Sequence, residues 1–294
     1  MSTNSDIRIF HCSDADRPML SRLCPSWFRS HQPTTSWAAV REGEVLGAIL
    51  LQYLDEGRVS FDLNTVSEDA VEACATALLE HAAEEARTSG ATMLDADVDS
   101  LAANRHEDLL LRRGFDVHET FDTFTAPRAQ LEERLTQIVD RTKGRIKSRV
   151  DAEIVQMEEK HLDAVAIAMA AWIGGSASRG IFQMRQQFHR RGKTDPQRRL
   201  QLVAIHEDRV VGFSCTSISS PGVLKIDGEG TDPRYRLDPM QTRLTLAMYE
   251  RAREAGIETI TFEAGSRQPN TRAMASRNRI ESIKQRRHLR LVLT

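Results

Sequence analysis

The sequence lacks the features that mark several classes of protein. Its four cysteines, at positions 12, 24, 74 and 215 of 294, show neither a C-x-x-C spacing nor a disulfide-dense pattern. The most apolar stretch, 165–173, is about half as long as a transmembrane helix, and charged residues interrupt the apolar core that a secretory signal would need in the first thirty positions. We therefore expect a soluble protein of the reducing cytoplasm that makes no membrane contact.

The sequence also lacks an excess of charge of either sign. It has 40 Lys and Arg against 42 Asp and Glu, with a net charge of -2 and a pI near 6.5. A nucleic-acid partner is therefore not expected, since such proteins usually carry a strong basic excess. His189 and His206 have no metal-ligand partners at useful spacing, so no metal is expected. The length allows two domains of ordinary size.

What the sequence does contain is an internal repeat. The stretches WAAVREGEVLGAILLQYL and LVAIHEDRVVGFSCTSI both have the pattern of a strand, a polar turn and a second strand. They align at an offset of 165 residues, which places Gly47 on Gly212. Later segments align at an offset of 166, which places Gly90 on Gly256. Several matches in the same order predict a duplicated domain.

Each copy has the same order of expected elements. Period-2 patterns predict strands and a 3.6-residue period predicts an amphipathic helix that ends at a glycine C-cap. The expected strands outside the hairpins are 7–10, 58–64 and 92–98 in the first copy and 153–156, 223–230 and 258–263 in the second. The expected long helices are 69–89 and 239–255, and a short helix opens near Asn104 and near Asn270.

These elements predict a mixed α/β fold with two tandem domains, each a mostly antiparallel mixed sheet flanked by helices. We expect an N-terminal domain over 1–127 and a C-terminal domain over 151–294. The stretch 128–150 between them is charged and amphipathic and has no core of its own, so we expect a linker helix there.

This order of elements resembles the GNAT fold of acyl-CoA N-acyltransferases, in a tandem arrangement similar to that of mycothiol synthase. The resemblance covers nearly the whole chain outside the linker. It implies that each sheet splays beside its fourth strand and that the pantetheine arm of acyl-CoA lies in the gap. It also implies that the pyrophosphate rests on the loop that opens the long helix.

The second copy keeps part of the family's phosphate loop. The family pattern is approximately V-x-P-x-Y-R-G-x-G-x-G-x-x-L, and residues 231–244 read TDPRYRLDPMQTRL. Backbone N–H groups at a helix N-terminus bind anions, and arginines add to this. The three glycines are replaced, by Leu237, Pro239 and Gln241, so the loop departs from the family's shape. The resemblance implies acetyl-CoA binding by Gly230, Thr231, Arg234, Tyr235, Arg236, Gln241, Thr242 and Asn270.

The first copy loses the basic part of this loop. Ala70 stands in place of the arginine, and Glu68 and Asp69 place negative charge beside the site, which opposes pyrophosphate binding. It keeps the family's Gly-Phe ending at Gly114 and Phe115, whereas the second copy lacks both that ending and the tyrosine expected after Asn270. We expect the first copy to be non-catalytic.

Acetyl transfer to an amine needs a base that accepts the amine's proton. In VLKIDGEGTDP, strand alternation predicts Lys225, Asp227 and Glu229 on one face. Glu229 and, as a weaker candidate, Asp227 are our predicted catalytic residues. The alternatives stay open: Asp227 can be a solvated strand residue, Arg234 and Arg236 can be surface charges, and Asn270 is a good N-cap by type alone.

We expect an N-acyltransferase that transfers an acetyl group from acetyl-CoA to a small-molecule or peptide amine. The alternative is a catalytically inactive tandem protein that binds a ligand or another protein, and the replaced glycines favour it. A basic stretch, 179–199, lies on the expected acceptor side, and it alone speaks for a third option, an RNA-linked donor.

Overall fold

The structure is a computed structural model, and it describes residues 7–23, 34–54, 57–66, 71–99, 106–142, 150–173, 184–185, 188, 200–235, 238–266 and 268–293. The chain divides into two compact units, and the first unit is made of two separate segments of the chain. Unit 1 comprises Met1–Phe121 together with Lys284–Thr294, and unit 2 comprises Asp122–Ile283.

Unit 1 is a sheet with a helix on each face. Its strands are β1 (Arg8–His11), β2 (Thr34–Arg41), β3 (Glu44–Tyr53), β4 (Arg58–Thr65), β5 (Met93–Asp99), the first half of β6 (Asp116–Pro127) and most of β12 (Ser282–Val292). Its helices are α1 (Arg17–Leu23), α2 (Val71–Thr88) and α3 (Glu107–Arg112), with a 3-10 turn η1 (Asp14–Asp16). Leu78 of α2 packs on one face, and Leu20 of α1 packs on the other.

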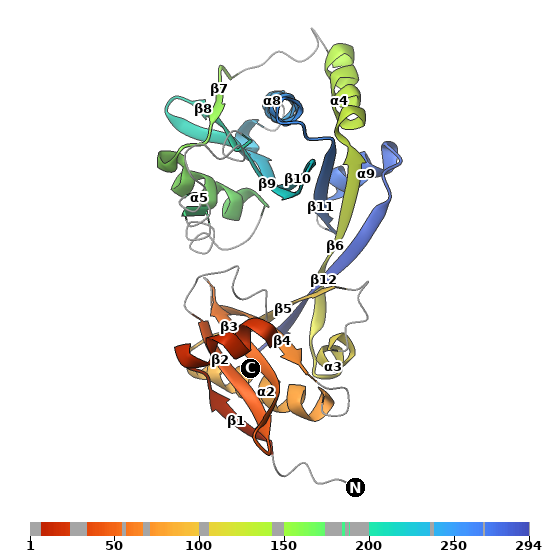
Figure 1. The fold of residues 1–294 in the computed structure, drawn as a ribbon. Helices are drawn as coiled ribbons and strands as arrows, with labels where there is room; N and C mark the ends of the chain where they lie inside the picture. The colour runs from red at the N-terminus through yellow and green to blue at the C-terminus, as the bar shows by residue number, and fades with distance from the viewer. Residues whose placement is uncertain are drawn as a thin grey trace. The chain divides into compact units, whose positions relative to one another are not determined.

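Unit 2 repeats this plan (Figure 1). Its strands are β7 (Glu153–Gln156), β8 (Leu202–His206), β9 (Arg209–Ser220), β10 (Val223–Thr231), β11 (Thr259–Gly265) and the second half of β6. Its helices are α4 (Arg128–Thr142), α5 (Leu162–Ile173), α8 (Met240–Glu254) and α9 (Pro269–Arg277), with 3-10 turns η3 (Glu159–His161) and η4 (Pro233–Tyr235).

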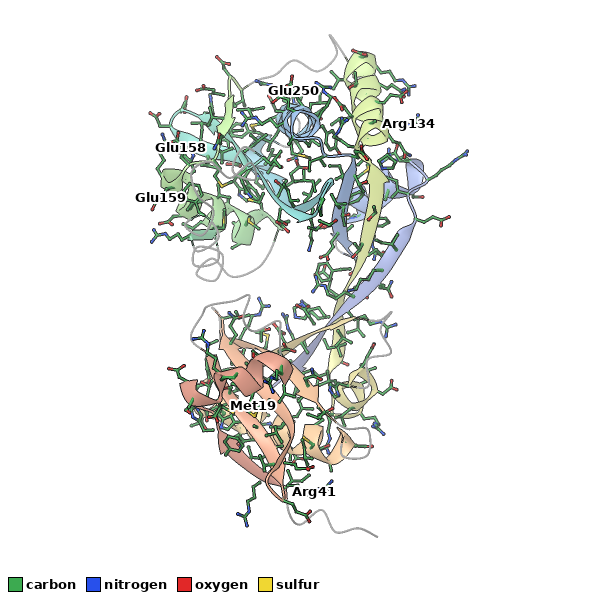
Figure 2. The ribbon with its side chains drawn as sticks, in the orientation of Figure 1. Met19, Arg41, Arg134, Glu158, Glu159 and Glu250 are labelled. Carbon is green, nitrogen blue, oxygen red and sulfur yellow. The ribbon has the colours of Figure 1, made fainter. Side chains whose placement is uncertain are left out.

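The two faces of the unit 2 sheet have separate cores. Leu244 and Met248 of α8 pack with Leu224 of β10 on one face. Val165 of α5 packs with Phe213 of β9 on the other. The outer face of α8 is polar, and Glu250 on it is exposed and points away from this core (Figure 2). Any side chain on β9 or β10 can therefore be assigned to the α8 face or to the α5 face.

The duplication is confirmed at the level of individual irregularities. In unit 1 Ala39 pairs with Gly47 and Val40 with Val45, which leaves one extra residue in β3. Ala204, Gly212 and Ile205 repeat this bulge in unit 2. A side chain at Gly47 would meet the Asn64 carbonyl oxygen at 2.7 Å, so the close approach of the next strand requires glycine there.

The predicted helix ends are also confirmed. α2 and α8 each end one or two residues before a glycine, and Gly90 and Gly256 have φ of +80° and +70°. A left-handed residue lets the backbone leave the last turn while its N–H groups still bond to helix carbonyls. The N–H of Ile257 bonds to the Ala252 carbonyl at 2.9 Å, as that of Ala91 bonds to Ala86.

The last strand of the chain lies in the sheet of unit 1. The hydrogen-bonded strand order is β1-β2-β3-β4-β5-β12-β6-β11-β10-β9-β8-β7. β12 is antiparallel to β5, with Arg290 opposite Asp95. The second half of β6 belongs to unit 2, where Phe124 stacks on Phe262 with ring centroids 5.3 Å apart. The predicted division at 127 and 151 did not foresee this exchange of closing strands.

A buried carboxylate holds β12 in place. Asp95 is 2% exposed and accepts hydrogen bonds from Arg58 Nη2 and from Arg290 Nε, both at 2.7 Å. His288 Nε2 lies 3.4 Å from the same carboxylate. Burial raises the pKa of Asp95, but the hydrogen bonds from His288, Arg290 and Arg58 outweigh it and hold the pKa well below its usual range.

The predicted linker stretch, 128–150, contributes to the core of unit 2. Its helical part is α4, in which Leu131 is buried against the α8 side of unit 2. Glu132 forms ion pairs with Arg128 on its own helix and, at 2.6 Å, with Arg253 of α8. Arg134 on the opposite side of α4 is exposed (Figure 2). α4 therefore packs as part of unit 2. Over the part of the chain that the structure describes, no helix is long and apolar enough to cross a membrane.

We predict that Asp95→Asn destabilises the protein. The substitution leaves Arg58 and Arg290 without their counter-charge, and breaking a pair of this burial costs about 3 kcal/mol. Denaturant unfolding would measure this loss. Asp97→Asn is the matched control, because Asp97 pairs with Arg286 while its side chain is 56% exposed, so we expect a loss below about 1 kcal/mol. Equal losses in the two variants would show that Asp95 does not hold β12.

Candidate functional site

β10 and β11 diverge in the middle of the unit 2 sheet. The two strands are parallel and pair from Val223–Thr259 to Ile226–Phe262. β10 continues to Thr231 and β11 to Gly265 beyond the last of these pairs. The backbone groups of an unpaired strand half are available to a ligand. The resemblance to the GNAT fold implied this splay beside the fourth strand.

A β-bulge at Asp227 changes which residues of β10 share a face. Ile226 pairs with Thr216 and Gly228 with the preceding Cys215, so Asp227 is an extra residue in β10. One extra residue reverses the alternation of side chains. The predicted shared face of Lys225, Asp227 and Glu229 is therefore wrong: Asp227 sits on the bulge, and Glu229 lies on the α8 face with Ile226.

The same bulge explains the change of offset between the two copies. Phe61 pairs with Leu51 as Ile226 pairs with Thr216, which keeps the offset at 165 up to this point. Beyond the bulge, Leu63 pairs with Ile49 as Glu229 pairs with Ser214. The offset between Leu63 and Glu229 is therefore 166, while that between Ile49 and Ser214 is still 165. The counterpart of Glu229 in unit 1 is therefore Leu63, which packs against the apolar core.

Glu229 is held between β9 and α8. The Thr245 hydroxyl lies 3.3 and 3.2 Å from its two carboxylate oxygens. Ser214, directly opposite Glu229 in the ladder, is fully buried, and its Oγ has no hydrogen-bond partner of good geometry among the described residues. Burial raises the pKa of Glu229 to about 7, and Ser214, Thr245 and Gln241 offset only part of the rise. The Ser214 hydroxyl is near enough to favour the charged form without completing a hydrogen bond. A carboxyl group with a pKa near 7 can accept or release a proton at neutral pH.

The loop that opens α8 is stabilised by carboxylates of the chain itself. Asp232 is buried, and Arg234 Nη2 lies 2.5 Å from its Oδ2. Asp238 Oδ1 accepts the backbone N–H of Met240 at 3.0 Å, where an anionic ligand would otherwise bind the helix N-terminus. Pro239 precedes this helix and has no N–H to donate. The donors of this loop are thus partly used inside the protein.

The other predicted cofactor-binding residues lie in several environments. Gly230 faces α5, where an added side chain would meet the Phe213 ring at 3.2 Å, so packing accounts for this glycine. Tyr235 is partly buried against the α8-side core. Thr231 and Thr242 are partly buried, and Gln241 Nε2 lies 3.4 Å from Thr245 Oγ1. Arg236 and the side chain of Asn270 lie outside the described residues, as does most of 179–199.

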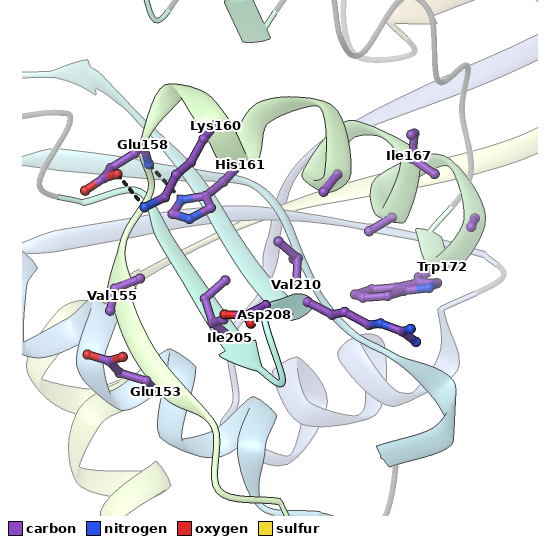
Figure 3. Close-up of a pocket in the computed structure, with 14 residues that line it drawn as sticks. Glu153, Val155, Glu158, Lys160, His161, Ile167, Trp172, Ile205, Asp208 and Val210 are labelled. Carbon is purple, nitrogen blue, oxygen red and sulfur yellow. Dashed lines mark hydrogen bonds and ion pairs between the residues drawn. The ribbon is translucent and has the colours of Figure 1, made fainter.

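A groove of about 920 Å³ lies on the α5 face of unit 2 (Figure 3). Its walls come from α5, β7 and the β8–β9 hairpin, with Trp172 and Ile167 on the helix side and Ile205 and Val210 on the sheet. At its rim the Glu158 N–H donates to His161 Nδ1 at 3.0 Å. No predicted site residue lines this groove, and Glu229 lies on the opposite face of the sheet.

The groove exists because small side chains replace large ones. In unit 1 the same face is filled by Phe10, Met19 and Leu23. The β1–β2 and β7–β8 ladders place Val155 where unit 1 has Phe10. The same alignment places Ala164 and Ala168 at the positions of Met19 and Leu23. Loss of this volume leaves the space open, since a core collapses only partly around missing atoms.

The histidines, cysteines and acids were candidates for a metal site only as a cluster. Within the residues that the structure describes, no group of three or more His, Cys, Asp or Glu side chains has an arrangement that could hold a metal ion. Cys12, Cys74 and Cys215 are buried free thiols, and burial raises the pKa of each. These thiols pack as small apolar side chains.

We predict that ionisation of Glu229 destabilises the folded protein. Its pKa is about 7 when folded and near 4.5 when unfolded, so the native state binds more protons between these values and stability falls as the pH rises through this window. The penalty above pH 7 corresponds to about 3 kcal/mol. Urea unfolding at pH 5 and pH 8 would measure this. Between these two pH values we expect the wild type to lose about 2.5 kcal/mol more stability than Glu229→Gln, because the unfolded carboxyl group is already partly ionised at pH 5. Glu250→Gln, on the exposed face of α8, is the control. Parallel curves for wild type and Glu229→Gln would contradict the prediction.

No family model matches the sequence, and no curated protein matches it. Among solved structures, a GCN5-related N-acetyltransferase from Sphaerobacter thermophilus is 11% identical, with a TM-score of 0.62, and the match covers 98% of this chain and 96% of that one. A tandem GNAT protein from the clavulanic acid biosynthesis pathway is 14% identical over 98% of this chain and 99% of that one, with a TM-score of 0.60.

A third structure adds to this result. A conserved protein from Enterococcus faecalis, described as a probable N-acyltransferase, is 8% identical over 98% of this chain and 73% of that one, with a TM-score of 0.65. Identities this low carry the architecture and not the substrate. Together with the internal repeat and the splayed strands, these likenesses establish that the chain has the fold of the tandem GNAT proteins, with two GNAT-like units in one polypeptide.

Proposed function

We propose that this protein is an acyl-CoA-dependent N-acyltransferase whose site lies in unit 2, at the gap between β10 and β11. The observation that carries the proposal is the loss of pairing between these strands after Ile226 and Phe262. A gap of this kind offers backbone groups to an extended ligand, as the pantetheine arm of acyl-CoA requires. Glu229 then lies on the open half of β10, three residues beyond the last pair.

The loop from Thr231 to Thr242 is the proposed seat of the pyrophosphate. Arg236 is the proposed cation for the phosphates, because Arg234 is already bound to Asp232. Gln241 and Thr242 are in the first turn of α8, where backbone N–H groups are not used by the helix. Asp238 caps the same turn, so phosphate binding requires this carboxylate to release the Met240 N–H. Asn270, at the start of α9, stays a proposed contact.

Glu229 is the proposed general base. The donor supplies an acetyl group as a thioester, and transfer replaces its C–S bond by an amide C–N bond. The attacking amine loses one proton, and Glu229 accepts it, while the departing thiolate takes a proton from water. The raised pKa of Glu229 suits this role, since a base with a pKa near the working pH transfers protons efficiently. Asp227, exposed on the bulge, is the weaker candidate. The proposed acceptor is a small-molecule or peptide amine.

The second candidate is a tandem protein that binds a ligand or another protein without catalysis. The pairing of Asp232 with Arg234 and the cap formed by Asp238 favour it, because the first neutralises a cation of the loop and the second places a carboxylate where the pyrophosphate of acetyl-CoA would bind. The two candidates differ in whether this loop binds acetyl-CoA.

Calorimetric titration with acetyl-CoA separates the two. We expect binding, and we expect Arg236→Ala to weaken it by about 10- to 100-fold, since a charged hydrogen bond contributes about 1.5 to 3 kcal/mol. Arg253→Ala is the matched control, with little expected effect, because Arg253 lies in the last turn of α8 and pairs with Glu132 instead of facing the loop. Absence of both heat and thermal shift at millimolar acetyl-CoA would exclude the acyltransferase. Equal effects of the two substitutions would show that the phosphates lie elsewhere.

Thiol release from acetyl-CoA tests the role of Glu229. With a panel of primary amines, we expect amine-dependent release at pH 7 that falls about 100-fold or more in Glu229→Gln, as is usual for the loss of a general base. Acetyl-CoA affinity is expected to stay within about twofold of the wild type, because a base acts on the amine's proton and not on the donor. Asp227→Asn is the comparison for the weaker candidate. A Glu229→Gln variant with full activity would remove Glu229 from the mechanism.

A further inference from the structure

The inner face of α8 is polar where it crosses the open half of β10. Gln241 and Thr245 are one helical turn apart on this face, and Thr245 reaches Glu229 on β10. Ser214 of β9 lies across the ladder from Glu229. We call this cluster the polar seam, and it consists of Ser214, Glu229, Gln241 and Thr245. Polar groups between a helix and a sheet need a specific reason, because burial of each costs free energy.

Unit 1 shows that the fold does not need the polar seam. The two long helices align at an offset of 166, since Leu244 and Leu78 are both fully buried at equivalent positions. The ladders align Ser214 with Ile49 and Glu229 with Leu63. The unit 1 counterparts of the seam are all apolar and belong to or pack on the core: Ile49, Leu63, Ala75 and Leu79. The same architecture therefore packs with four apolar side chains at these positions.

The substitution of apolar by polar residues is concerted. A single buried carboxyl group in an otherwise apolar layer would have no donors, whereas the seam places two hydroxyl groups and an amide around Glu229. Departures from good core packing that are shared by several neighbouring residues are typical of functional sites. The seam thus marks the α8 face of unit 2 as the specialised one, and the matching face of unit 1 as structural.

The hydrogen bonds of the seam are incomplete. Thr245 has one hydroxyl proton, and Oγ1 lies 2.9 Å from the Gln241 carbonyl oxygen but 3.2 Å from the nearer Glu229 oxygen. It therefore shares its proton between two acceptors. Ser214 Oγ is buried and completes no hydrogen bond of good geometry in the described part of the chain. A side chain or ligand that brings a donor or a cation can complete this arrangement.

Among the residues that the structure describes, no basic side chain forms an ion pair with Glu229. Tyr249, one turn beyond Thr245 on α8, feels the charges of Glu229 and of Glu132 on α4. Cys215 on β9 feels those of Asp227 and Glu229. Glu132 and Asp227 are carboxylates, and they disfavour a further negative charge. Tyr249 and Cys215 are neutral, because burial raises the pKa of each. Lys225 faces away, toward Glu263 of β11 at 3.6 Å.

We propose that Ser214, Gln241 and Thr245 are positioning residues, which hold the Glu229 carboxyl group on the open half of β10 and donate the hydrogen bonds that its ionised form needs. The inference rests on the proposed function, in which Glu229 gives and takes a proton. It extends that function to three residues that do not touch the reacting atoms. Their removal is expected to change the protonation of Glu229 before it changes the fold.

Carbon-13 NMR of the glutamate carboxyl groups in the full chain tests this proposal without any substrate. The Glu229 signal is identified by its loss in Glu229→Gln. Thr245→Val keeps the shape of the side chain and removes its hydroxyl, and we expect the Glu229 pKa to rise by about one unit. Thr245→Ser restores the hydroxyl and is expected to restore the pKa. Ser214→Ala and Gln241→Ala are expected to raise it by smaller amounts.

Thr261→Val is the matched control. Thr261 is on β11 of the same unit, and its hydroxyl oxygen lies 3.1 Å from that of Thr125 on β6 and not beside the polar seam. It is expected to leave the Glu229 titration unchanged. If Thr245→Val does not fold, Ser214→Ala takes its place as the variant that lacks a hydroxyl group, and Thr245→Ser takes the place of the wild type as the variant that keeps it. The Glu229 pKa is then expected to be higher in Ser214→Ala than in Thr245→Ser. An unchanged or lowered pKa in Thr245→Val, or a Thr245→Ser variant that behaves like it, would overturn the proposal. If the Glu229 pKa changes as expected but the protein binds no acetyl-CoA, the positioning role of the three residues stands and the acyltransferase is excluded.

Discussion

The pairing of β12 with β5 is the interaction on which the arrangement of the chain depends. It covers the open edge of the unit 1 sheet, and it places Leu289 in the apolar core on one face. On the other face Asp95 binds Arg290 of β12 and Arg58 of β4. An unpaired buried carboxylate would be costly, so these partners must be present together. Because β12 lies in the sheet of unit 1, the sheet of unit 2 is completed by the second half of β6.

The two units use one architecture for different purposes because their long helices meet different side chains. In unit 1 α2 packs on apolar side chains of the sheet, among them Ile49, Leu51 and Leu63. In unit 2 the bulge at Asp227 turns Glu229 into the layer between β10 and α8, where unit 1 has Leu63. Unlike Asp95, which pairs with two arginines, Glu229 has only hydroxyl and amide donors around it in the described part of the chain, so its burial does not form an ion pair that would stabilise the fold. The proposed chemistry is therefore assigned to unit 2, with unit 1 as its structural partner.

Unit 2 also shows how a binding loop can be held by the protein's own charges. Asp232 and Asp238 occupy the donors of Arg234 and of the first turn of α8, so an anionic ligand has to displace a carboxylate or bind beside it. The groove lies on the α5 face of the sheet, where unit 2 has smaller side chains than unit 1. The loop and the groove are thus built from different elements and lie on opposite faces of the sheet.

The sequence by itself determined the features that depend on neighbours in the chain. The duplication, the hairpins, the helix ends at Gly90 and Gly256 and the presence of a carboxylate in β10 all follow from local patterns, because side-chain period and glycine dihedrals are properties of a few consecutive residues. The tertiary structure alone decided the partner of β12 and the face on which Glu229 lies. Strand partners are chosen by hydrogen bonds between distant segments, and one extra residue in the ladder reverses every side chain beyond it. The change of offset from 165 to 166 was visible in the sequence, but only the β9–β10 register showed that the extra residue is Asp227.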